Sequence, residues 1–334
     1  MPTSEGRERG KETTMLAQET IPPDEAATIE SFISFLKETS AARAVGTPAG
    51  IRRFNQARAS GCMDAEFIVP ADLPDALKVG LFARPGTYAA RVRFANATSA
   101  DDSEKDIRGL SLKVRGVAGE NLTPGVSDQD FVLNSHPVMM AADAKSFMEL
   151  LRANEAGGMS RVGYFAAHPR AAKVALEAQQ HHSCHLDIPY WSATPYLFGE
   201  GRAVKYGVYP TSSRRSPAPP HRPSKSYLTD ELIRRVAEAE STFDVMVQLQ
   251  VDGKRTPIED AMEEWSDRIS PYQRVATLRI PPQRIDAAEQ WQQCEQMRFN
   301  PWHAPVAHRP LGSMNRARRA IYQALADFRQ GVGR

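Results

Sequence analysis

The sequence predicts an α+β protein in which an antiparallel β-sheet or barrel forms the core and helices surround it. Apolar and polar residues alternate with a period of two in several separate segments, as they do in strands with one buried face. Gly and Pro turns separate these segments, which favours antiparallel connections. Other segments repeat their apolar residues at helical spacing.

The first expected element is an amphipathic helix that follows Pro22 and Pro23. Asp24 can cap its first turn. Its apolar side chains follow at i, i+3, i+4 and i+7: Ile29, Phe32, Ile33 and Leu36. Residues 1–21 are polar and show no periodicity, so we expect a disordered lead-in there and one domain over residues 22–334.

Strands and further helices are expected along the rest of the chain. Alternation predicts strands at 87–94, 110–114, 245–251 and, less regularly, 275–280. In the first of these, one face is apolar and the other carries Arg91 and Arg93. Helical spacing predicts helices at 144–153, 170–180, 230–239, 287–297 and 313–329. Residues 210–226 contain five prolines, which predicts an exposed loop.

Composition and charge exclude several classes of protein. The 334 residues are 41% hydrophobic, which is enough for a large core. A net charge of +2 gives no global field for nucleic acid or an anionic membrane, so we expect a small-molecule partner. There is no membrane-spanning or signal-peptide run of apolar residues, and Cys62, Cys184 and Cys294 lack the spacing of a disulfide framework. These features predict a cytoplasmic protein.

Arg318 and Tyr322 form the first candidate for chemistry. They stand four residues apart on the last expected helix, so they share a face, and the guanidinium can donate to the phenolic oxygen. An unperturbed tyrosine titrates near pH ~10, and such a donor favours the anion that a ferric ion would bind. The same spacing is also typical of a surface arginine beside a half-buried aromatic residue.

Other segments place this pair in a wider pattern. They are 53–61 (RFNQARASG), 86–88 (GTY), 92–94 (VRF), 106–113 (DIRGLSLK), 129–134 (QDFVLN) with Pro137, 190–196 (YWSATPY) and 309–312 (RPLG). In this order they resemble catalases, and especially the compact catalase-related haem proteins, over most of residues 45–334. The resemblance implies a catalase-like antiparallel β-barrel, a C-terminal helix that carries the haem ligand, and haem b as cofactor.

The resemblance also implies roles for individual residues. Tyr322 matches the proximal iron ligand, and Arg318 matches its hydrogen-bonding partner. Phe147 would stack on the distal face of the haem. The remaining matches are the arginines that bind the haem propionates: Arg53, Arg93 and Arg329. Guanidinium groups suit that role because they pair with carboxylates in two-pronged fashion and stay charged when desolvated.

The distal side departs from the catalase pattern. Asn134 matches the distal asparagine, although an asparagine in a turn would look the same. Gln56 stands where catalases carry the distal histidine, Asn55 replaces a small apolar residue, and Ala95 replaces the supporting serine. Glutamine cannot carry a proton between peroxide oxygens, and loss of a positioned acid–base group costs ~10² to 10⁴ in rate. His136 is nearby, but we interpret it as a loop residue.

These features favour a haem-dependent oxidoreductase that acts on a hydroperoxide or a specialised organic substrate, with weak or absent ordinary catalase activity. Asn134, Gln56 and Asn55 would orient that substrate through their amides. Two alternatives stay open: a hydroperoxide isomerase or dehydratase, and a non-catalytic haem carrier or sensor. The resemblance further implies association into a homo-oligomer, which we take as a dimer, and the chain lacks the length for an NADPH-binding domain.

Two other clusters have simpler interpretations. The run 181–185 (HHSCH) offers four metal donors, but donors so close together seldom form a closed site, so a polar loop is favoured. The basic cluster Arg316, Arg318 and Arg319 lies on one helix without interleaved aromatics, which does not indicate nucleic acid.

Overall fold

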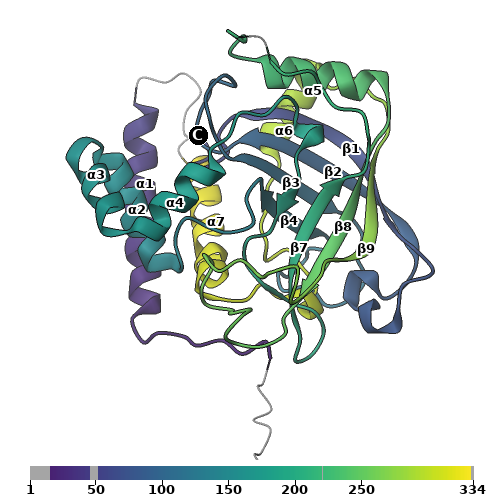
Figure 1. Ribbon diagram of the computed structural model, residues 1–334, viewed down its shortest axis with the longest axis horizontal. Coiled ribbons are helices and arrows are strands. Elements are labelled where there is room, and N and C mark those ends of the chain that lie inside the picture. The colour runs from purple at the N-terminus through teal and green to yellow at the C-terminus, as the bar shows by residue number, and fades with distance from the viewer. Residues whose placement is uncertain (1–15, 46–51, 220, 332–334) are drawn as a thin grey trace, which may run out of the picture.

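The computed structural model describes residues 16–45, 52–219 and 221–331. Over these ranges the strands are β1 (Ala59–Val69), β2 (Gly86–Asn96), β3 (Arg108–Val114), β4 (Gln129–Asn134), β5 (Tyr190–Trp191), β6 (Tyr196–Leu197), β7 (Ala203–Pro210), β8 (Ser241–Leu249) and β9 (Gln273–Ile280). They pair antiparallel in the order β5-β4-β3-β2-β1-β9-β8-β7, and β5 also pairs with β7. The eight strands therefore close into a barrel, with β6 added beside β7 (Figure 1).

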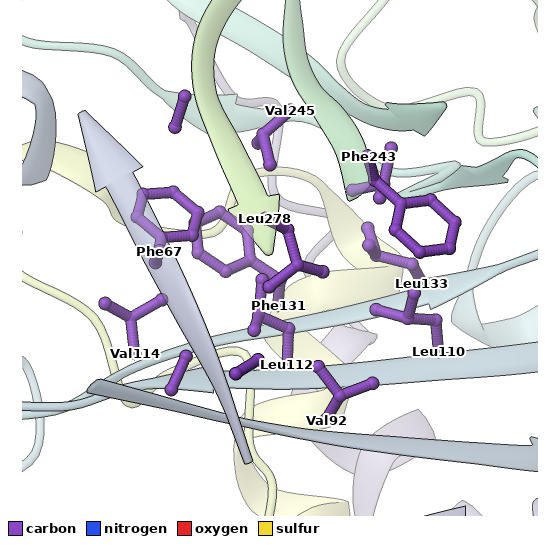
Figure 2. Close-up of a cluster of buried hydrophobic side chains, with 14 of the residues drawn as sticks. Phe67, Val92, Leu110, Leu112, Val114, Phe131, Leu133, Phe243, Val245 and Leu278 are labelled. Atoms are coloured by element: carbon purple, nitrogen blue, oxygen red, sulfur yellow. The ribbon is translucent and has the colours of Figure 1, made fainter. Parts of the chain in front are cut away.

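The interior of the barrel is filled with apolar side chains. Figure 2 shows Phe67, Phe131 and Leu278, from three different strands, pointing toward one another. The rings of Phe67 and Phe131 stack with their centroids 6.0 Å apart. Because strand side chains alternate, the apolar set of each strand faces inward and its other residues face the outside of the barrel. The barrel is therefore a packed core, and any ligand site lies outside it.

Helices cover the outside of the barrel. They are α1 (Glu25–Ala44), α2 (Ala144–Ala156), α3 (Gly158–Ala167), α4 (Pro169–Ala178), α5 (Tyr227–Glu238), α6 (Ala288–Gln296) and α7 (Ser313–Gly331). α7 lies between the barrel and the pair α1 and α2 (Figure 1). These three helices share a second apolar cluster that includes Phe32, Met148 and Ile321. This second core brings α7 against the outer face of the barrel.

The predicted fold class is confirmed, and so are the expected strands, which correspond to β2, β3, β8 and β9. The expected helices correspond to α1, α2, α4, α5, α6 and α7, each within a few residues. Five strands and one helix were not predicted: β1, β4, β5, β6, β7 and α3. The described part of 211–226 holds no helix or strand, as its prolines predict.

The expected disordered lead-in, 1–21, lies partly outside the described residues, since residues 1–15 are among those not described. Its last residues contact the body of the protein. Glu19 accepts hydrogen bonds from Arg316 Nη1 at 2.6 Å and from the Gly312 amide at 2.8 Å. Thr20 donates its amide hydrogen to Glu259 at 2.9 Å. These contacts attach the segment before α1 to the start of α7.

A disulfide joins Cys62 of β1 to Cys294 of α6, and the third cysteine, Cys184, is buried and free. The sequence did not indicate this bond, and the prediction from cysteine spacing is corrected here. The two cysteines are 232 residues apart and meet only because α6 packs on β1. Within the described residues, no helix is both long and apolar enough to cross a membrane.

Candidate functional site

A cavity of about 570 Å³ lies outside the barrel, against β2, β3 and β4, and is walled on its other sides by α1, α2, α3 and α7. All the site residues expected from the sequence line it: Arg53, Asn55, Gln56, Arg93, Asn134, Phe147, Arg318, Tyr322 and Arg329. They come from segments far apart in the sequence. The fold therefore brings the whole predicted set to one cavity of the size that binds small molecules and cofactors.

The barrel wall of this cavity follows from strand alternation. Val92 and Phe94 of β2 point into the barrel core, so Arg93 between them points outward. Arg93 is paired in register with Ser111 of β3, which is paired in turn with Val132 of β4. These three outward side chains form a row on the floor of the cavity.

The opposite wall is α7, which presents Tyr322 and Arg318. Arg318 Nη2 donates to the Tyr322 phenolic oxygen over 3.1 Å, and Nη1 donates to Asn315 Oδ1 over the same distance. Asn315 is itself fixed, since it donates to the Pro195 carbonyl at 2.9 Å. Burial lowers the pKa of Arg318, but the phenols of Tyr322 and Tyr196 outweigh that effect and raise it. Arg318 is therefore a fixed cation beside the tyrosine oxygen.

Three arginines gather at another side of the cavity. Arg93 is only 1% exposed, and its Nε has no hydrogen-bond partner within the described residues. Burial lowers the pKa of Arg93 to about 9, and repulsion from Arg53 and Arg329 acts in the same direction. Burial and the charge of Arg53 also lower the pKa of Arg329. The positive charge of this cluster therefore exceeds the negative charge near it.

Glu295, at the end of α6, is the nearby carboxylate. It accepts from Arg53 Nη1 at 2.8 Å and lies 3.9 Å from Arg93 Nη2. Arg53 also donates through Nη2 to the carbonyls of Glu295 at 3.0 Å and Met297 at 2.7 Å. One half-exposed carboxylate therefore faces three cations, and Arg53 is held to the end of α6.

Gln56 has a left-handed backbone, with a φ of 54°. Its amide donates to the Ala97 carbonyl at 2.8 Å, and its own carbonyl accepts from Arg93 at 2.7 Å. A Cβ at Gly109 would lie 2.3 Å from Gln56 Nε2, so the glycine gives the side chain its space. Asn55, the residue before it, is exposed at the edge of the cavity.

Asn134 and Phe147 complete the predicted set. Asn134 ends β4, and its Oδ1 accepts the His136 amide at 2.9 Å. This is the turn geometry that the sequence left open, yet it frees the Nδ2 donor for the cavity. Phe147 projects from α2 and meets Phe32 edge-on at 6.1 Å. His136 is not among the lining residues, and its Nδ1 lies 3.2 Å from the Val138 carbonyl.

The described wall of the cavity offers no free base. It includes no histidine, and its one carboxylate is Asp106. That carboxylate already accepts from the amides of Thr98 at 2.8 Å and Ser99 at 2.9 Å, and from the Thr98 hydroxyl at 3.0 Å. Polar groups that face the cavity can therefore donate hydrogen bonds, while the oxygens of the one described carboxylate are already engaged.

The run 181–185 ends in the buried core. No group of three metal-binding side chains occurs among the described residues. Instead, His185 is fully buried, contacts Ser60 Oγ at 2.9 Å and stacks on Phe94. Burial lowers the pKa of His182 to about 4. The end of this run therefore belongs to the core rather than to a polar loop.

Sequence reasoning missed several residues of the cavity. Ser111 stands in one of the matched segments, and its position opposite to Leu110 and Leu112 could have placed it on the outer face. Glu295, although next to Cys294, carries no signal for a long-range ion pair. Arg161 and Phe165 line the cavity from α3, a helix that has no buried residue and hence no apolar stripe to reveal it.

Comparison with known proteins shows which known fold this structure has. No protein-family model matches the sequence, and no curated protein matches it either. The structure has the catalase-like fold, an α+β barrel with a C-terminal helix. It is similar to the crystal structure of a fungal catalase, with a TM-score of 0.64 and 15% sequence identity over 84% of this chain. The match spans 60% of the catalase chain, and at this identity it shows the fold alone.

Proposed function

We propose that the cavity holds haem b and that Tyr322 is the residue that would bind its iron. The observation that carries this proposal is the pairing of Tyr322 with Arg318 at 3.1 Å in the same cavity as three clustered arginines. A haem needs both features, an anionic ligand for iron and cations for two propionates. When bound, haem supplies an iron that exchanges electrons with peroxides.

Arg93 supports the fit most directly. Its Nε lacks a partner within the described residues, and burial together with the charges of the neighbouring arginines lowers its pKa. A buried donor without an acceptor is unfavourable by ~1–3 kcal/mol, more for charged groups, and a propionate would remove that cost. Arg53 and Arg329 would share the carboxylates, while Phe147 would cover one face of the ring.

We further propose a haem-dependent oxidoreductase that acts on a hydroperoxide or another organic substrate. Asn134 would orient the substrate through Nδ2, because its Oδ1 is already bonded to the His136 amide. Gln56 would add a second amide without moving a proton. Since Asp106 is fully bonded and no histidine is among the described lining residues, efficient disproportionation of hydrogen peroxide is not expected.

The same absence of a free base, within the described wall, favours a second candidate. A hydroperoxide isomerase or dehydratase rearranges its substrate without an external electron donor. Such a reaction depends on holding the substrate in position, which the amides of Asn134, Gln56 and Asn55 would do. Product analysis distinguishes the two, since a peroxidase reduces the hydroperoxide to an alcohol and an isomerase or dehydratase does not.

Titration of the protein with ferric haem b tests the proposal. We expect stoichiometric binding with the absorption spectrum of a tyrosinate-ligated ferric haem, and Tyr322→Phe should abolish that spectrum. Tyr88→Phe is the matched control, because Tyr88 is half-buried on β2 and does not line the cavity. An unaltered spectrum in Tyr322→Phe would contradict the assignment of Tyr322 as the iron ligand. Haem binding without turnover of any hydroperoxide would instead indicate a carrier.

A further inference from the structure

The cavity is strongly electropositive. Its described lining holds one carboxylate, Asp106, against the arginines Arg52, Arg53, Arg93, Arg161, Arg298, Arg318 and Arg329. Most have a partner or a proposed role: Arg318 bonds Tyr322, the Arg53, Arg93 and Arg329 cluster suits the propionates, and Arg298 bonds Gln330 and lies 4.0 Å from Asp327. The exposed side chain of Arg161 has no hydrogen-bond or ion-pair partner among the described residues, so its guanidinium at the cavity wall is open to a ligand and has no role in the haem proposal.

Arg161 stands on α3 beside apolar groups. Phe165 follows it by four residues, so the two side chains lie on the same face of the helix, and both line the cavity. α3 packs against α2, whose Leu151 and Asn154 line the same cavity. Met139 and Met140 add further apolar surface. The wall at α3 therefore combines an apolar surface with one unneutralised cation.

Such a wall suits a substrate of matching chemistry. A cavity lined by charges of one sign concentrates ligands of the opposite sign. A guanidinium binds a carboxylate through two parallel hydrogen bonds, and it does so without losing its charge. Apolar surface beside it would take up the body of the ligand by excluding water. Hydrogen peroxide, which is small and neutral, uses neither feature.

We propose that the substrate of this site is an organic carboxylate with an apolar body, whose carboxylate binds Arg161 and whose apolar part lies against Phe165 and Leu151. The inference rests on the proposed function, since it names the substrate class of the same cavity. Arg161 is then a specificity-determining residue, at a distance from the reacting atoms. Arg52, exposed and also on the cavity wall, adds to the attraction for anions.

Calorimetric titration of the haem-loaded protein with 4-phenylbutyrate and with 4-phenyl-1-butanol tests this inference. The probes share an apolar body and differ in charge. We expect the butyrate to bind at least about tenfold more tightly than the alcohol, and Arg161→Gln to remove most of that difference. Lys173→Gln is the matched control, because it removes one positive charge from the neighbouring α4 at a residue outside the cavity. It should leave both affinities within about twofold.

Other outcomes overturn the inference. Equal affinity for the two probes, no binding of either, or an Arg161→Gln variant that behaves like wild type would each contradict it. Arg93→Gln separates this site from the arginine cluster: if that variant, and not Arg161→Gln, loses butyrate binding, the anion binds at the proposed propionate site. Failure of the haem titration would instead contradict the proposed function, and the Arg161→Gln comparison can still be made on the protein as purified.

Discussion

Arg93 donates through Nη2 to the backbone carbonyl of Gln56 at 2.7 Å, so a residue of the arginine cluster fixes the main chain at the residue that we propose faces the substrate. The Gln56 amide is held as well, by the Ala97 carbonyl at 2.8 Å. Both bonds use backbone atoms of Gln56. Its side chain can therefore be exchanged without removing the contacts that set its left-handed φ of 54°.

Gln56→His should increase hydrogen peroxide disproportionation. The imidazole would supply the proton carrier that the described wall lacks, and Gly109 leaves space for a ring. Ala95 cannot support the histidine as a serine would. We therefore expect the rate of disproportionation to rise about 10- to 100-fold, at the low end of what a positioned acid–base group contributes. Oxygen evolution by the haem-loaded protein measures it. Gln56→Asn is the control without a titrating group, and an equal gain in that variant would contradict the explanation.

Arg318→Met should weaken haem binding by about tenfold or more, because it removes the donor to the Tyr322 oxygen, the atom that we propose binds the iron. Competition with a haem-binding globin measures the affinity. Arg319→Met serves as the control on the same helix, since Arg319 is exposed and lies over the Trp302 ring, 4.8 Å from its centroid. Equal losses in the two variants would indicate damage to α7 rather than loss of this donor.

The barrel could be predicted from the sequence because its strands alternate, and alternation is a local property. β2 and β3 each carry an apolar set that faces the core, so period two identifies them. β7 was missed because Ala203–Tyr206 is buried throughout, on both faces, and shows no alternation. α3 was missed because it buries nothing. Elements that lack a one-sided burial pattern give no periodic signal.

The sequence predicted the part of the site that comes from the segments resembling catalases. Arg93 and Asn134 stand in such segments, Tyr322 follows the last of them on the C-terminal helix, and all three line the cavity. Glu295 and Arg161 do not, because an ion pair or a free cation at a cavity is a property of tertiary structure. The Cys62–Cys294 bond is of the same kind: spacing in the sequence carries no information about which strand a helix packs on.

Reduction of the disulfide should destabilise the protein. The bond closes a chain of 232 residues, and of α6 only Cys294 is buried, so this bond is a main attachment of the helix to β1. We expect a loss of about 2–4 kcal/mol of unfolding free energy in dithiothreitol. Urea unfolding with and without the reductant measures it. The double variant Cys62→Ser/Cys294→Ser should be insensitive to dithiothreitol, and a reductant effect that persists there would contradict the assignment of the stability loss to this bond.

His308 is a buried histidine whose protonation would weaken its contacts with Leu81 and with Tyr206 of β7. It is fully buried, and its Nε2 accepts the Leu81 amide at 3.1 Å while Nδ1 lies 3.2 Å from the Tyr206 hydroxyl. Because Nε2 accepts a hydrogen bond, the single proton of the neutral imidazole lies on Nδ1. Protonation would remove the acceptor at Nε2. Burial accordingly lowers the pKa of His308 from 6.5 to about 4.

The free energy of unfolding should therefore fall as the pH drops from 6.5 to about 4. In that window the unfolded chain binds a proton at His308 and the folded chain does not, so acid favours unfolding, by an amount on the order of 3 kcal/mol at pH 4. His308→Gln keeps an acceptor for the Leu81 amide but cannot titrate. Between pH 7 and 4, this variant should therefore lose less unfolding free energy than the wild-type protein does, and the difference should be on the order of 3 kcal/mol. His182 and His185, whose pKa values burial also lowers, contribute to the loss that remains. Urea unfolding across this range measures how the unfolding free energy depends on pH.

The control is His221→Gln, because His221 is exposed, and this variant should show the same pH dependence as wild type. A His308→Gln variant with the wild-type pH dependence would refute the assignment to His308.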